Sequence, residues 1–505
     1  MHDSLITDAQ SNKTMREKIV KLLFTPIPGT KRIEQGLFRV ICMSLTKLRQ
    51  WSVTSLIFLL KSLRWFVPSV SVLLAIWMIG GNFLASQQEK EIEQDIDEFV
   101  ERFPDTEPND SALKLRALMA KLGISGDGAT EFPIDAYTMS HPDFAVSPSG
   151  RQAFDEIREE LGDYLDAQIS KPNDTVEPIP DKLRQYLIEN SEDIEAISQH
   201  ILNNEVPRWE RHIPPTWKGN PIFALPSHLN LVDLQRIINL YILEKNSRDQ
   251  SQEAEKMLEV SWQINQSIRN EYYFITLIVA RMAGMYTTGV LRKIDYLPVE
   301  WQQRLLKDDY QELFVNSLQG EFFDKFKLMK NLYLYPSDVW GEHIFLVGLL
   351  KLRILEPYRS FSAIDTYNWQ KQFLAGYNQY NICLSDSAAI NARPAWWNRP
   401  GQIISNYVIF LRKESQYRLD LELTQKILKV KALAAETGKW PQSLPNMESE
   451  ICPGVEWVYQ VSPDDTMSIS LSEQPEWLTE RIENQNALPL TYSTRRIPDY
   501  DQSLN

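Results

Sequence analysis

One stretch of this sequence limits where most of the chain can lie. Residues 65–85 read WFVPSVSVLLAIWMIGGNFLA and contain no charged side chain. At a helical rise of about 1.5 Å per residue the stretch reaches roughly 30 Å, the thickness of the hydrocarbon core of a bilayer. No other segment of the chain has the same uncharged length. The stretch therefore predicts one transmembrane helix.

The charges on either side of this segment predict its direction. Residues 1–64 contain eleven Lys and Arg against four Asp and Glu, a net charge of +7, whereas residues 86–505 carry −21, which gives the chain total of −14. Because cytoplasmic flanks are enriched in Lys and Arg, we expect a cytoplasmic N-terminus and an external C-terminal part. Sixty-four residues precede the segment. That is too many for a cleavable signal peptide, so we expect a retained anchor.

The basic arm at 1–64 mixes cationic and apolar residues over its second half. This pattern favours an amphipathic helix lying on the anionic cytoplasmic leaflet, although an ordinary retention signal beside a membrane helix carries the same charges. The strongly acidic remainder would repel phosphates, so nucleic acid is excluded as a partner. Of the three cysteines, Cys383 and Cys452 fall in the external part, where a disulfide and two free thiols are both compatible with the sequence.

The external part predicts a mainly α-helical body. The acidic run 87–101 is expected to extend the membrane helix as a solvated stalk, on which Ile92, Ile96, Phe99 and Val100 form a thin apolar stripe. Apolar residues at three- and four-residue spacing indicate a helix hairpin at 229–270, with a turn at Asn246–Gln250 and a capping box of Asp249 and Gln252. Further helices are expected at 111–122, 151–167, 180–204, 271–291 (central, because it is apolar on most sides), 298–308, 310–331, 337–356, 362–380 and 403–437.

The sequence period changes from helix to strand after Gly438, which we expect to end the long helix in a left-handed conformation. Trp440 is expected to pack back on that helix near Leu433 or Ala434. Alternating apolar residues on either side of the turn at 462–465 predict a small antiparallel hairpin. The predicted order is a basic arm at 1–64, a transmembrane helix at 65–85, an acidic stalk and linker at 86–150, a helical body at 151–437, a small β element at 438–475 and a loose tail at 476–505.

Two segments resemble known families. The 229–270 hairpin resembles a tetratricopeptide-type unit, with Ala254 as the small residue between its helices, but it lacks the W-x₂-L-G-x₂-Y pattern and has no second copy at a 34-residue step. The segment GKWPQSL at 438–444 is similar to part of the heads of type II secretion pseudopilins, although here the preceding helix is not the membrane helix. Together with the anchor, these features resemble a class of uncharacterised bacterial membrane-anchored proteins. The resemblance implies a bacterial inner membrane with the C-terminal domain in the periplasm, and it implies no activity.

The motifs that position a metal, a nucleophile or a phosphate are missing, including H-E-x-x-H, G-x-S-x-G, C-x₂-C and the phosphate-binding glycine loops. No two histidines stand four residues apart, so we expect no metal, no cofactor and, on balance, no catalysis. Ser227 and His228, with Glu210 and His212, are the nearest to a catalytic group, but Ser227 fits better as a helix cap. Arg281 is expected to be either a paired buried cation or the edge of a pocket.

The best binding candidate is the loop that contains Arg393, Trp396, Trp397 and Arg399. Aromatic planes beside guanidinium groups stack on sugars, hold anions or lie at a membrane interface, and paired tryptophans also fill gaps between helices. We expect a non-catalytic envelope protein whose helical body docks other proteins. The alternatives are a membrane-tethered hydrolase acting on envelope material, with a pocket near this loop, and an accessory component of a secretion or pilus system.

Overall fold

The structure is a computed structural model, and it describes residues 53–125, 146–211, 217, 228–269, 271–295, 297–307, 310–331, 353–377, 394–398, 401, 408–474, 478 and 488–495. The chain divides into two compact units, Met1–Ile79 and Gly80–Asn505. The described part is mainly helical and ends in a small antiparallel sheet, which confirms the predicted mainly helical chain with a small β element after the helices. The basic arm lies outside the described residues, as do parts of the predicted linker and tail.

The predicted membrane segment is helical and belongs to a longer helix, α3 (Val53–Arg102). Among the described residues, two helices are long and apolar enough to cross a membrane. Only 6% of the most apolar window is buried in the first, Phe66–Arg102, against 72% in the second, α10 (Phe274–Leu291). Side chains of the first unit, including Phe66, Leu73 and Ile76, are exposed. The described residues therefore leave the apolar surface of the first part of α3 mostly uncovered.

The later part of α3 corrects the prediction of a solvated stalk. One stripe of this part is buried in the core of the second unit and consists of Ala85, Ile92, Ile96 and Phe99. The acids beside it pair with lysines of other helices. Glu93 contacts Lys327, and the carboxylate of Asp95 lies 2.7 Å from the ammonium group of Lys371. The predicted apolar stripe is therefore present, but it is packed in the core and not solvated. The sequence shows the acids beside it and not their distant lysine partners.

Most predicted helices are present. Besides α3 and α10, the described helices are α4 (Asp110–Lys121), α5 (Pro148–Ile169), α6 (Asp181–Glu189), α7 (Ser191–Asn203), α8 (Leu229–Ser247), α9 (Ser251–Ile268), α11 (Val299–Leu306), α12 (Tyr310–Lys330), α14 (Glu356–Gly376) and α16 (Val408–Thr437). A short 3-10 turn, η5 (Arg353–Leu355), precedes α14. The helix expected at 180–204 is two helices, separated at Asn190. The helix expected at 362–380 begins earlier, because Pro357 fits the first turn of a helix. Most of the segment expected at 337–356 lies outside the described residues.

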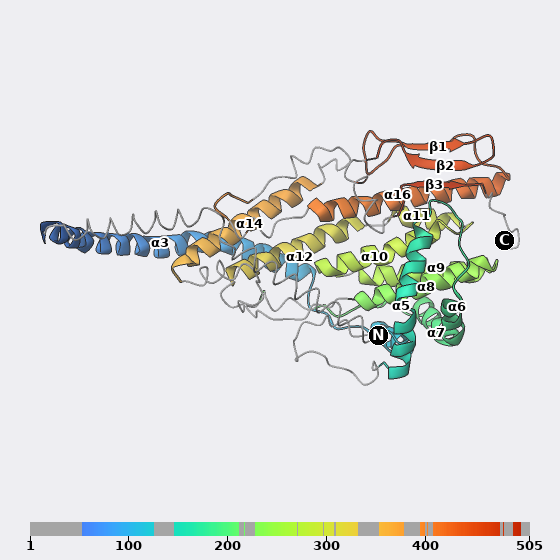
Figure 1. Cartoon of the computed structure of the whole chain (residues 1–505), viewed down its shortest axis with the longest axis horizontal. Helices are drawn as coiled ribbons and strands as arrows, with labels where there is room; N and C mark the ends of the chain where they lie inside the picture. Colours follow the sequence, from blue (N-terminus) through green and yellow to red (C-terminus); the bar gives the residue numbers. More distant parts are fainter. Residues whose placement is uncertain are drawn as a thin grey trace, which may run out of the picture. The chain divides into compact units, whose positions relative to one another are not determined.

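The hairpin of α8 and α9 packs against α10, which also contacts α5, α12 and α16 and is central as predicted (Figure 1). A buried polar contact joins the three helices, because the side-chain amide of Gln235 donates to the backbone carbonyl of Ser261 at 3.0 Å and to the hydroxyl of Thr287 at 2.7 Å. The predicted capping box is wrong. Asp249 has a left-handed φ of 58°, and Gln250 at the start of α9 makes no side-chain cap hydrogen bond.

The C-terminal sheet has three strands in the order β1 (Trp457–Val461), β2 (Met467–Leu471) and β3 (Thr491–Thr494). The first two form the predicted hairpin. The third lies in the segment predicted as a loose tail, so that prediction is wrong for β3. The buried ring of Tyr492 and a 2.7 Å hydrogen bond from the Thr494 hydroxyl to Asp174 attach the strand to the helical body. A strand of four residues is too short to show a clear alternation of apolar and polar residues, and its partner Asp174 is distant in the sequence. β3 is therefore not predictable from the sequence alone.

The junction between α16 and the sheet is as predicted in two respects. Gly438 has a left-handed φ of 68°, and Trp440 is buried, with 4% of its surface exposed. The indole N–H of Trp440 donates to the backbone carbonyl of Asp465 in the β1–β2 turn at 3.0 Å. Cys452 is part of a disulfide bond, which excludes the free thiol, and its partner lies outside the described residues.

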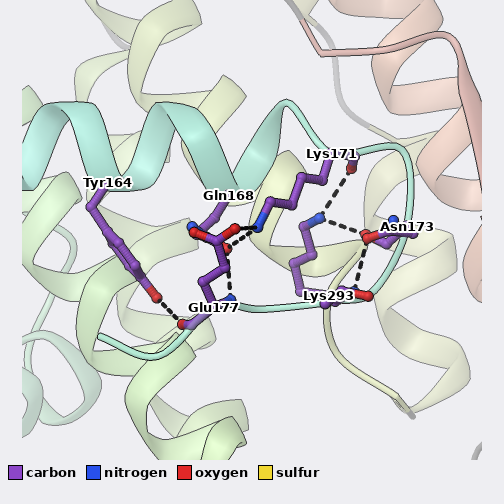
Figure 2. Close-up of polar contacts among 7 residues, drawn as sticks. Tyr164, Gln168, Lys171, Asn173, Glu177 and Lys293 are labelled. Atoms are coloured by element: carbon purple, nitrogen blue, oxygen red, sulfur yellow. Dashed lines mark hydrogen bonds and ion pairs between the residues drawn. The ribbon is translucent and has the colours of Figure 1, made fainter. Parts of the chain in front are cut away.

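The loop after α5 is tied to the end of α10 by a buried lysine (Figure 2). The ammonium group of Lys293 donates to the backbone carbonyls of Lys171, at 3.0 Å, and of Asn173. Burial, followed by the nearby cations Arg292, Lys171 and Lys431, lowers the pKa of Lys293 to about 7. Beside it the hydroxyl of Tyr164 donates to the backbone carbonyl of Glu177 at 2.7 Å. These contacts are made mainly to backbone groups, so we interpret this lysine as structural.

Candidate functional site

The tryptophan loop is held on α14 by one buried asparagine. The side-chain amide of Asn398 donates to the carbonyl of Ser362, the carboxylate of Asp365 and the hydroxyl of Thr366, each at 2.9 Å. Its carbonyl oxygen accepts the backbone N–H of Gly401 at 2.9 Å. A Cβ atom at Gly401 would lie 2.3 Å from the Thr366 hydroxyl, so only glycine fits there. Asn398 therefore attaches the loop to α14 and also holds the backbone of Gly401.

The two tryptophans of this loop have different surroundings. Trp396 has 81% of its surface exposed, so it fills no gap between helices. Trp397 is half-buried. Its backbone carbonyl accepts the hydroxyl of Tyr358 at 2.9 Å, and the two rings meet edge to face with centroids 6.1 Å apart. Arg393 and Arg399 lie outside the described residues. Trp396 is therefore exposed to solvent, whereas Trp397 packs against Tyr358.

This loop lies beside the end of the apolar segment of α3. A Cβ atom at Gly81 would be only 2.7 Å from Cβ of Pro357, so the start of α14 lies directly against that turn of α3. Further along, the hydroxyl of Tyr367 donates to Asp95 at 2.8 Å, so the two helices run side by side (Figure 1). Near Gly81, Phe83 is 62% exposed. Tyr358 follows Pro357, and its hydroxyl group bonds to the backbone of Trp397. Trp397 is therefore one tyrosine side chain away from the part of α14 that contacts Gly81.

A charged cleft of about 390 Å³ lies between α5 and α8, and its walls are formed by Asp155, Arg158, Glu159, Gly162, Asp163, Asp166 and Arg236. The buried Asp233 is paired with Arg158 at 2.8 Å and with Arg236 at 3.3 Å. A Cβ atom at Gly162 would lie 3.8 Å from the Arg236 guanidinium, an ordinary contact distance, so the two helices approach closely at this point of the cleft.

The cleft was not predicted. Asp155, Glu159 and Asp163 recur every four residues along α5, which places them on one face. This acidic stripe is the signal that could have revealed the cleft. Of the two basic residues in the wall, Arg158 lies on α5 itself, and Arg236 comes from α8, some seventy positions later in the chain, which no local pattern shows. A cleft walled by charges suits a polar peptide segment better than an apolar small molecule.

A buried titratable cluster lies at the start of the α8 hairpin. His228 has a left-handed φ of 48° and is buried beside the ring of Trp209, whose centroid is 5.5 Å away. Burial lowers the pKa of His228 to about 4. Burial also raises the pKa of Glu271 to about 8, against the opposing charge of Arg211. Both side chains are therefore neutral near pH 7.

The structure describes only part of the weaker catalytic candidate. His228 and Glu210 come near each other, and Glu210 is ion-paired with Arg116. Ser227 and His212 lie outside the described residues. The N-cap position of α8 is held by His228, which makes no side-chain cap hydrogen bond, so the prediction of Ser227 as the cap is wrong. Within the described part of the chain, no three His, Cys, Asp or Glu side chains are grouped so as to hold a metal ion.

Arg281 forms part of the wall of a cavity of about 150 Å³ between α10, α12 and α16, which agrees with the expectation of a pocket edge. The other walls are largely apolar, with Lys413 and Glu414 as further charged residues.

Comparison with protein-family models, with curated proteins and with solved structures gave no match for this chain. Its function is therefore argued from its own residues.

Proposed function

We propose that this chain is a non-catalytic protein of the bacterial envelope, anchored by the apolar segment of α3, whose helical body docks another protein. In this proposal the N-terminal arm is cytoplasmic, the anchor crosses the inner membrane once, and the body lies in the periplasm. The direction follows from the positive arm and the acidic remainder. The disulfide at Cys452 is in keeping with an oxidising compartment.

One observation carries the anchoring. The apolar side chains from Phe66 to Leu84 are mostly exposed, and a soluble protein rarely exposes a contiguous apolar surface of this extent. Removal of apolar surface from water is worth about 25 cal/mol per Å², so a bilayer would stabilise this helix strongly. The equally apolar α10 is covered by other helices and needs no membrane.

The charged cleft supports docking and indicates the kind of partner. Its rim carries the exposed carboxylates of Asp155, Glu159 and Asp163, while Arg158 and Arg236 are already paired with Asp233. The unpaired charge that the rim offers is therefore negative. Complementarity favours a partner segment that carries lysine or arginine.

The anchoring is tested by membrane fractionation of the full chain. Replacement of Leu73 and Ile76 together by arginine puts two charges on the exposed face of α3, each of which costs about 2.5–3.5 kcal/mol at the centre of a membrane helix. We expect the double variant to be lost from the membrane fraction. A matched control, Ile188→Arg, changes an exposed apolar residue on α6 and should leave fractionation unchanged. Retention of the double variant in the membrane after alkaline extraction would contradict the anchor.

Docking is tested by capture of partners with tagged full chain in gentle detergent. The double variant Glu159→Arg and Asp163→Arg reverses two exposed charges of the cleft, and Glu192→Arg reverses an exposed charge on α7 as the control. We expect the same partner with the native chain and with the control, and its loss with the cleft variant. A partner retained by all three, or recovered by none, argues against this docking site.

The hydrolase alternative is favoured by one observation. A carboxyl group with a pKa of about 8, as at Glu271, has the protonation of a general acid at neutral pH. Hydrolysis of envelope polysaccharide or peptide by the native chain, abolished by Glu271→Gln, would replace the docking proposal. The secretion or pilus alternative depended on an exposed Trp440 as a recognition surface, and Trp440 is buried.

A further inference from the structure

We propose that Trp396, supported by Trp397 and Tyr358, contacts the lipid headgroup layer and fixes the helical body at the membrane surface. The inference rests on the proposed anchoring by α3. It adds a second, separate contact between this chain and the bilayer, made by a loop more than three hundred residues after the anchor.

The level of the loop follows from contacts within the second unit. Gly81 touches Pro357, the next residue Tyr358 reaches the carbonyl of Trp397, and Trp396 adjoins it. Gly81 precedes the end of the apolar segment at Ala85 by four residues, about 6 Å of helix. Charged side chains begin at Glu89. The loop therefore lies beside the transition from apolar to charged residues on α3, which is the level of a bilayer interface.

The residue types fit this level. Tryptophan and tyrosine concentrate where a membrane meets water, because their rings are largely apolar while an N–H or O–H group reaches polar neighbours. Trp396 is the most exposed of the large apolar residues in the described chain, and its exposed ring would gain from an amphipathic surface. The hydrogen bonds of Asn398 pin the loop backbone, so little further loop freedom is lost on contact.

A lipid surface explains the position better than a sugar or a protein partner. A sugar site would need polar groups converging on the ring, whereas the polar side chain of Asn398, in the described part of the loop, is hydrogen-bonded to α14. The turn of α3 that Pro357 contacts at Gly81 belongs to an apolar helix surface, on which Phe83 is exposed. A partner protein at this place would have to cover the exposed face of α3 as well.

The test measures the depth of a fluorescent probe on the full chain in lipid nanodiscs that carry nitroxide-labelled headgroups. Cys42→Ser reduces background labelling, and this parent without an added cysteine is labelled in parallel. Probes are attached at Phe83→Cys in the anchor, at Ala395→Cys beside Trp396, and at Ile188→Cys as an exposed control on α6. We expect strong quenching at 83 and 395, and at 188 only the weak quenching of a probe in solution.

A second pair of variants tests whether the membrane contact depends on the Trp396 ring or only on the position of the loop. In the Ala395→Cys background, Trp396→Ser should reduce the quenching at 395, and Trp396→Tyr should restore most of it, because tyrosine also favours the interface. Unchanged quenching with serine would overturn the role of Trp396.

The remaining outcomes distinguish this inference from the proposed function. Quenching at 83 without quenching at 395 would overturn the loop contact and leave the anchor intact, with the loop free for a protein or sugar. Absence of quenching at both positions would overturn both.

Discussion

The apolar half of α3 and the core helix α10 are similar in hydropathy and opposite in surroundings. Both are long and apolar enough to cross a membrane, yet 6% of the apolar window is buried in the first and 72% in the second. The two helices differ in how closely other side chains pack against them. α10 has Gly284 and Gly289 where neighbouring side chains approach closely, whereas nothing lies within 4 Å of a Cβ atom at Gly80 in α3. Hydropathy identifies both helices, and only packing distinguishes the exposed apolar helix from the core helix.

The largest expected difference in stability is between two variants that each place one arginine on one of these helices. Val279→Arg places an unpaired cation in the core of the body, which should cost more than about 4 kcal/mol and prevent stable folding. Ile76→Arg changes a side chain that is 62% exposed and should leave the unfolding of the body unchanged. Thermal unfolding of the full chain in detergent measures both. An equal loss of stability in the two variants would contradict the contrast between the buried α10 and the exposed part of α3.

The same contrast holds for two tryptophans. Trp440→Ala removes a buried ring and its hydrogen bond to Asp465, and should cost about 3–5 kcal/mol. Trp396→Ala removes an exposed ring and should change the free energy of unfolding by less than about 0.5 kcal/mol. Denaturant unfolding of both variants decides this. An unchanged midpoint for Trp440→Ala, with loss of a captured partner, would instead make Trp440 a recognition residue.

The start of α10 should make stability depend on pH. Glu271 has a pKa of about 8 in the folded chain and an ordinary value near 4.5 when unfolded. Between these values the folded state binds more protons, so stability falls as pH rises through this window and is constant above it. Glu271→Gln lacks this dependence. The difference in unfolding free energy between native chain and variant should therefore decrease from pH 6.5 to 8.5, a range in which neutral His228 contributes little. A difference that is constant across this range would contradict the assignment.

The smallest effect concerns the glycines. A Cβ atom at Gly289 would lie 2.6 Å from Cβ of Ile169, so Gly289→Ala should cost about 1–3 kcal/mol by overpacking. Gly80→Ala meets open space and should be neutral or slightly stabilising, because alanine favours a helix. Chemical denaturation of the paired variants gives the comparison, and a neutral Gly289→Ala would show that α10 packs less closely than described.

The features that the sequence predicted correctly are local ones. The α8–α9 hairpin, the left-handed Gly438 and the β1–β2 hairpin each follow from spacing over a few turns or from a single residue type. The features it missed depend on distant partners. β3 needs β2 and Asp174, and the acidic run of α3 needs lysines more than two hundred residues away.

The candidate loop shows the same limit. Its composition marked Trp396 and Trp397 as binding residues, but no pattern showed that Asn398 pins the loop or that only Trp396 is exposed. Its position beside Gly81 depends on a helix pairing across more than two hundred residues. Arg393 and Arg399 stay predictions, because the structure does not describe them.

Topology tests the central claim most directly. Reporters that are active only after export are fused at residue 50, before the anchor, and after residue 110, beyond α3. A single crossing with a cytoplasmic N-terminus predicts an inactive reporter at residue 50 and an active one after residue 110. An active reporter at residue 50, or an inactive one after residue 110, would contradict the account.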